Sequence, residues 1–93
     1  MQMKGQEREL FRLALLRVLE ANQTRFGLGA AALAHLASMY GFARLTEEQV
    51  WREIQYLEDK GQVAGVDKAI SPENRVWRIT ACGRDYLAGV ANG

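Results

Sequence analysis

Apolar side chains recur at every third or fourth position in three stretches of this chain: residues 6 to about 22, 30–40 and 47–60. This spacing gathers apolar residues on one face of a helix. Gly41 and Gly61 follow the second and third stretches, where a glycine can adopt the left-handed conformation that ends a helix. The sequence therefore predicts three helices.

The third predicted helix has the clearest start. Thr46 is suited to be its N-cap, and Gln49, three residues later, completes a capping box. Leu45 stands where it can pack against Val50 as a hydrophobic staple. We therefore expect this helix to begin at residue 47.

Beyond the third helix the apolar period changes to two. Residues 62–67 and 75–80 alternate in this way and predict the two strands of a hairpin. Residues 71–74, Ser-Pro-Glu-Asn, suit a type I turn between them, because proline presets the φ angle. Residues 26–29 can add a very short extended segment.

A last short helix is predicted from residue 81 to about 88, with Thr80 as its N-cap. We expect Tyr86 and Leu87 to return to the core, and residues 90–93 to form a frayed tail. The whole chain, 1–93, is then one domain, ordered from about residue 6 to residue 89. Its predicted fold class is mainly α with a small β-hairpin.

Two motifs resemble those of winged helix-turn-helix proteins. The spacing of Leu57, Gly61 and Val63 is similar to the end of the recognition helix in regulators of the MarR, ArsR and PadR type. A second motif resembles the ending of small winged-helix proteins, including uncharacterised ones of Mu-like prophages, and comprises Trp77, Ile79, Thr80, Gly83, Leu87 and Gly89. The resemblance implies a three-helix core, a two-stranded wing and a short C-terminal helix. It also implies a transcriptional regulator that binds double-stranded DNA through the third helix and the wing.

The predicted outer face of the third helix carries side chains suited to read bases. Arg52 can bond guanine and Gln55 can bond adenine. On a helical wheel of residues 47–60, Glu48 and Asp59 share this face, and Gln49 and Tyr56 flank it. Together with the wing, the predicted DNA-contacting residues are Thr46, Glu48, Gln49, Arg52, Gln55, Tyr56, Lys68, Asn74, Arg75 and Arg78.

The distribution of charge opposes a simple electrostatic attraction to DNA. The net charge is +1, but residues 45–67 contain two basic and six acidic residues and so carry a net −4. Phosphate contacts would therefore rest on cations elsewhere: Lys68, Arg75, Arg78 and Arg84 around the wing, and Arg25 or Arg44 near the second helix. Alternatively, these arginines form solvated faces or ion pairs with Glu73 and Asp85.

Enzymatic chemistry is not expected. His35 has no Cys, Asp or Glu at ligand or triad spacing, and we interpret it as an ordinary core or surface residue. Cys82 stands in the first turn of the last helix, where a thiol can be activated, but burial as a small core residue is the preferred interpretation. No phosphate loop or cofactor motif is present, so we expect no cofactor and no metal. With no apolar run of membrane-spanning length, we expect a cytoplasmic protein.

Apolar residues on the first helix cover more than one face. Either the helix lies centrally, which we favour, or it lends a face to a partner such as a second copy. Trp77 is expected to point inward, and Trp51 to close the core rather than anchor an interface. Two hypotheses remain open: a DNA-binding protein acting as a dimer, which we favour, and a protein-interaction module that uses the acidic third helix or the first.

Overall fold

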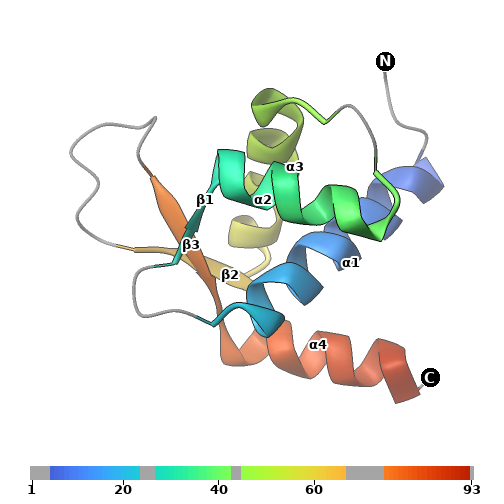
Figure 1. Cartoon of the computed structure of the whole chain (residues 1–93). Coiled ribbons are helices and arrows are strands. Elements are labelled where there is room, and N and C mark those ends of the chain that lie inside the picture. The colour runs from blue at the N-terminus through green and yellow to red at the C-terminus, as the bar shows by residue number, and fades with distance from the viewer. Residues whose placement is uncertain (1–4, 24–26, 43–44, 67–74, 93) are drawn as a thin grey trace.

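The computed structural model describes residues 5–23, 27–42, 45–66 and 75–92. In these ranges, helices dominate and short strands form a small sheet (Figure 1). The elements are α1 (Gly5–Ala21), β1 (Leu28–Gly29), α2 (Ala30–Ala37), the 3-10 helix η1 (Ser38–Tyr40), α3 (Glu47–Asp59), β2 (Val63–Gly65), β3 (Val76–Ile79) and α4 (Ala81–Asn92).

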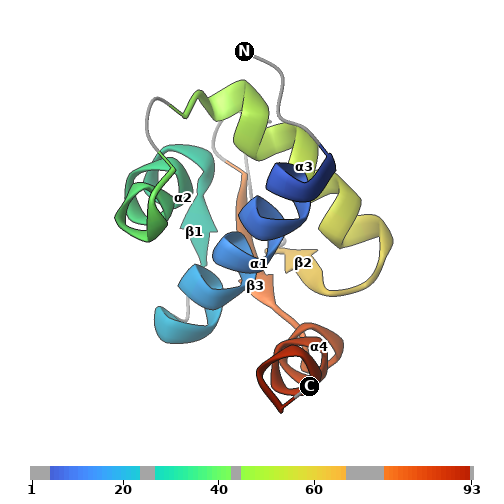
Figure 2. The same ribbon diagram turned by 90° about the vertical axis from the view of Figure 1, so that its right-hand side faces the viewer.

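Helix α1 lies at the centre of the molecule. It packs against α2, α3, α4 and strand β3, and Figure 2 shows the other helices arranged around it. Its core-facing residues Phe11, Leu15 and Leu16 are fully buried. The expected central placement of the first helix is thus confirmed, and the width of its apolar arc follows from having neighbours on several sides.

The sheet has three antiparallel strands in the order β1-β3-β2. The predicted hairpin is confirmed by the pairing of β2 with β3, in which Val63 faces Ile79. The short extended segment expected before the second helix is β1, and it pairs with the other edge of β3, so the sheet has one strand more than the predicted hairpin. Gly27 makes this approach possible, because its φ is +77° and a Cβ there would lie 2.7 Å from the carbonyl oxygen of Trp77.

The second predicted helix is divided in two. Regular α-helix ends at Ala37, and a 3-10 turn continues to Tyr40 before Gly41, whose φ of +96° stops the helix as expected. The hydroxyl of Ser38 donates a hydrogen bond to the carbonyl of His35. Such local bonding by serine competes with the regular helix and accounts for the tighter last turn.

The last helix is longer than predicted. It continues to Asn92, so residues 90–92 are helical and the expected frayed tail there is wrong. Leu87 is buried as expected, but Tyr86 is 46% exposed. Gly83 and Leu87 are both buried one turn apart on the core side of α4, which directs Tyr86 outward.

Thr80 joins the end of α3 to the start of α4. Its hydroxyl donates to the carbonyl of Gly61 at 2.6 Å and accepts from the N–H of Gly83 at 3.1 Å. Its own N–H donates to the carbonyl of Gln62. The predicted N-cap is confirmed. A Cβ on Gly83 would overlap the Gln62 carbonyl, so only glycine permits this close approach.

The two tryptophans meet in the core. Trp77 is fully buried, and the centre of its ring lies 4.8 Å from the ring centre of the half-buried Trp51 in an edge-to-face arrangement. This confirms that Trp77 points inward and that Trp51 closes the core between α3 and the sheet.

Candidate nucleic-acid interface

The start of α3 is fixed by a complete capping box. The N–H of Gln49 donates to the Thr46 hydroxyl oxygen at 3.1 Å, and the N–H of Thr46 donates to Gln49 Oε1 at 2.9 Å. The capping prediction is therefore confirmed. Both residues were also predicted to contact DNA, and the structure shows their side chains already engaged at the helix end.

The outer face of α3 presents the predicted polar residues to solvent. Arg52 and Gln55 are exposed, as are Glu48 and Asp59, whereas the opposite face buries Val50, Ile54 and Leu57. Arg52 Nη2 lies 3.5 Å from Glu48 Oε1, and 60% and 83% of the two side chains are exposed. Such a surface pair contributes at most about 1 kcal/mol, so a ligand can replace Glu48 as the partner of Arg52.

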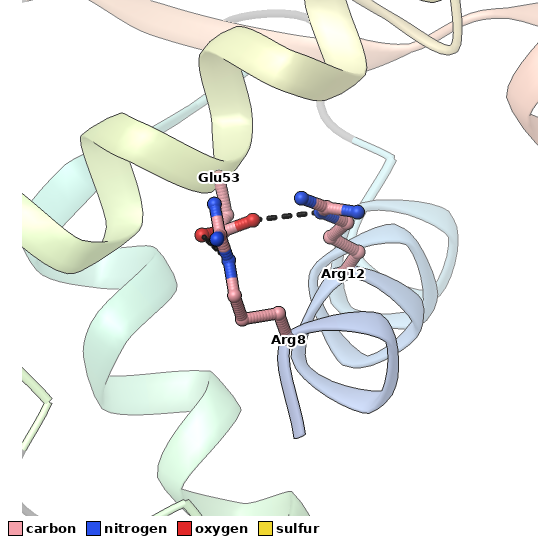
Figure 3. Close-up of polar contacts among 3 residues, drawn as sticks. All are labelled: Arg8, Arg12 and Glu53. Atoms are coloured by element: carbon pink, nitrogen blue, oxygen red, sulfur yellow. Dashed lines mark hydrogen bonds and ion pairs between the residues drawn. The ribbon is translucent and has the colours of Figure 1, made fainter. Parts of the chain in front are cut away.

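A buried glutamate lies on the inner side of α3. Glu53 is 4% exposed and receives hydrogen bonds from two arginines of α1: Arg8 Nε at 3.1 Å and Arg12 Nε at 2.7 Å. Figure 3 shows the two guanidinium groups converging on the carboxylate. These contacts compensate the buried charge, and we refer to the three residues as the inner cluster.

Sequence reasoning missed the inner cluster, although a signal for it exists. Glu53 lies three positions after Val50 and four before Leu57, which places it on the core face of α3. Arg8 and Arg12 are four residues apart, one above the other on α1. A charged residue at a core position therefore indicates a partner, but the sequence does not say which helix supplies it.

Tyr56 lies at the edge of the exposed face of α3 that is next to α1. The guanidinium of Arg12 lies 3.6 Å from the centre of its ring, and Lys60 Nζ lies 5.6 Å from it. The ring borders a hollow of about 220 Å³, lined by Glu9, Arg12, Tyr56, Leu57, Lys60, Gln62 and Tyr86. Tyr56 therefore stays 40% exposed beside Arg52 on α3, but its ring is already covered on one side by Arg12 of α1.

Arg75 is paired with α3. Its Nη2 lies 3.1 Å from Glu58 Oε2, with 39% and 28% of the two side chains exposed, and its guanidinium stands 6.0 Å from the ring centre of Trp77. An ion pair is one of the two interpretations of this arginine, and among the described residues its partner is Glu58 and not Asp85; Glu73 lies outside the described residues. Arg75 therefore lies at the edge of α3, where part of its guanidinium stays accessible.

Arg78 lies on the face of the sheet opposite to the buried face that carries Trp77. It alternates with the buried Trp77 and Ile79, and its partner on β2 is the exposed Ala64. It lines a small hollow together with Arg84 and Gln23. The structure therefore does not bring Arg78 together with Arg52 and Gln55. The remaining predicted contacts, Lys68 and Asn74, and the remaining predicted cations, Arg25 and Arg44, lie outside the described residues. The predicted turn at residues 71–74 lies outside them as well.

The two residues considered for other chemistry both lie at the surface. Cys82 is exposed, which corrects the expectation of burial, because the core side of α4 is taken by Gly83 and Leu87. His35 is exposed on α2. Within the ranges that the structure describes, no three His, Cys, Asp or Glu residues come close enough to hold a metal ion.

No helix in the described part of the chain is both long and apolar enough to cross a membrane. Comparison with known proteins finds no protein-family model and no curated protein that matches the chain.

Proposed function

We propose that this protein is a winged-helix DNA-binding protein, with α3 as the helix that enters the major groove and β2 and β3 as the base of the wing. The observation that carries the proposal is the division of α3 into a buried face and an exposed face with Arg52 and Gln55 at its middle. These are side chains that can form paired hydrogen bonds with guanine and adenine. Regulation of transcription is the role we propose for such binding.

Residues 45–67 are acidic, which disfavours DNA binding, but the ion pairs in the structure reduce this objection. Two of the six acids, Glu53 and Glu58, are engaged by arginines from α1 and from the residue before β3. Their charge is thus compensated locally instead of acting on an approaching phosphate. The −4 of residues 45–67 therefore overstates the repulsion that DNA would meet at α3.

Part-exposed arginines on both sides of α3 also favour DNA. The side chain of Arg8 is 43% exposed and that of Arg75 is 39% exposed. Each binds a carboxylate through one side of its guanidinium, and a guanidinium has five N–H donors. The remaining donors are available for phosphate oxygens along the edges of a groove that holds α3.

The experiment is a titration of a labelled mixed-sequence duplex with the protein, followed by fluorescence anisotropy at low and near-physiological salt. We expect a rise that weakens steeply with salt, because phosphate contacts release counterions. Arg52→Ala should weaken binding about five- to tenfold, whereas Gln55→Ala should alter preference between sequences more than overall affinity.

Arg84→Ala is the matched control: it removes the same charge from an exposed position on α4, and although the sequence suggests Arg84 as a phosphate contact, it lines a hollow with Arg78 and with no residue of α3. We expect it to weaken binding less than twofold. Equal losses for Arg52→Ala and Arg84→Ala would show that general charge, and not α3, determines the affinity. A duplex that does not bind at low salt would overturn the proposal.

A protein-interaction module is the second candidate function. It is favoured by the exposed acids on α3, Glu47, Glu48 and Asp59, which suit a basic partner surface. The same variant separates the two candidates. Arg52→Ala makes α3 more acidic, so it should strengthen binding to a basic protein surface while it weakens binding to DNA.

A further inference from the structure

One face of α1 stays largely exposed in the described part of the chain, with Glu9, Leu10 and Arg17 at the surface. The core side of this helix is centred on Leu15, and Leu13 lies about 160° away on the helical wheel. By the helical period Leu13 is therefore near the middle of the outward side; its side chain is partly buried and also packs against the core. In Figure 2 the N-terminal half of α1 lies in front, with α2, α3 and α4 around it.

An apolar groove runs along one side of this face. Leu10 is 53% exposed and Tyr40 is 46% exposed, which are high values for large apolar side chains. They border a hollow of about 200 Å³ that is lined by Leu10, Leu13, Ala14, Arg17, Tyr40 and Phe42. Exposed apolar surface of this kind, grouped and bordered by charge, marks an interaction site.

Opposite charges stand at equal distances on either side of Leu13. Glu9 precedes it by four residues and Arg17 follows it by four, so the three side chains form one ridge along α1. Glu9 and Arg17 are both exposed, and neither forms an ion pair in the ranges that the structure describes. When a second copy of this ridge runs antiparallel to the first, the acid of each copy lies opposite the base of the other and the two apolar centres meet.

We propose that this face of α1 binds the same face of a second copy of the chain, with the two helices antiparallel about a two-fold axis at Leu13. The axis places Glu9 of each copy beside Arg17 of the other, and it brings the two Leu13 side chains together between these ion pairs. Leu10 and Tyr40 add apolar surface beside the seam. A two-fold interface must be self-complementary, and this ridge meets that condition. The inference does not depend on DNA binding.

The test is sedimentation equilibrium of the full chain over a range of concentrations, with charge-swapped variants. The wild type should be in concentration-dependent equilibrium between monomer and dimer. Glu9→Arg and Arg17→Glu should each weaken the dimer about tenfold, because the symmetry places like charges together twice. The double variant, Glu9→Arg with Arg17→Glu, restores opposite charges and should return to within about threefold of the wild type.

Both positions are exposed and unpaired, so these variants should keep the fold, and circular dichroism checks this. Asp85→Arg, an exposed acid on α4, is the matched control and should leave the dimer unchanged. A protein that is monomeric at every concentration would overturn the proposal. A dimer that is indifferent to the single swaps, or one that the double swap fails to restore, would overturn it as well.

Discussion

Two ion pairs on α3, only five residues apart, differ in almost every physical respect. Glu53 is enclosed between helices and receives two arginines, whereas Glu48 is 83% exposed and lies 3.5 Å from Arg52. Removing one partner of a buried pair leaves an uncompensated charge at a cost of about 3–5 kcal/mol, whereas an exposed pair contributes about 0–1 kcal/mol. The inner cluster can therefore hold α3 in place, whereas a ligand can replace Glu48 as the partner of Arg52.

The strongest way to break this contrast is Glu53→Gln. The amide keeps the size of the side chain but leaves Arg8 and Arg12 without a counter-charge. Because Arg8 is partly exposed and can regain water, we expect a loss of about 2–3 kcal/mol in the free energy of unfolding, below the range for a fully buried pair. Chemical denaturation followed by tryptophan fluorescence measures it. A loss below about 1 kcal/mol would mean that the inner cluster does not hold α3.

The two arginines of the inner cluster should differ. Arg12 has 19% of its side chain exposed, against 43% for Arg8, and it also packs over Tyr56. We expect Arg12→Ala to cost about 1.5–2 kcal/mol and Arg8→Ala about 0.5–1 kcal/mol. The same denaturation experiment compares them. Equal losses would show that burial does not determine the strength of these contacts.

Glu58→Gln tests an intermediate case, because this pair is more exposed than the inner cluster and less exposed than Glu48 with Arg52. We expect a loss of about 0.5–1 kcal/mol in unfolding free energy, reduced at high salt. Denaturation at low and high salt gives both numbers. A loss as large as that of Glu53→Gln would contradict the ranking by exposure.

Glu48→Gln should have the smallest effect on stability, within about 0.3 kcal/mol, since the pair is exposed. Its effect on DNA binding should be larger and of opposite sign. The change frees Arg52 and removes an acid from the outer face, so affinity for the duplex should rise about threefold. Fluorescence anisotropy measures this, with Glu20→Gln on α1 as the control. Reduced affinity would argue against α3 as the DNA-facing helix.

Local signals predicted the helices and their ends well. The capping box at Thr46 and the left-handed Gly41 depend only on neighbours in the sequence, and both are confirmed. The end of α4 was placed too early, because Gly89 and the small residues after it suggest fraying although the helix continues to Asn92. Local composition predicts where a helix can end, but packing determines where it does end.

The candidate site depended more on long-range contacts and was predicted less completely. The outward direction of Arg52 and Gln55 follows from the helical period, and it is confirmed. The pairing of Arg75 with Glu58, and of Glu53 with two arginines more than forty residues away, joins segments that the sequence does not relate. The position of Arg78 away from α3 follows from the sheet register, which fixes the face on which every residue of β3 lies.

The hydrogen bonds of Thr80 also bear on which changes of chain length this fold can accept. One hydroxyl links Gly61 to Gly83, and the pairing of Val63 with Ile79 begins directly beside it. A residue inserted within β3 would shift one part of the strand by one position and turn Trp77 to the solvent side. Insertions at this end of the sheet would therefore disrupt the core, so a designer who wishes to lengthen the chain should keep the spacing between Trp77 and Gly83 unchanged.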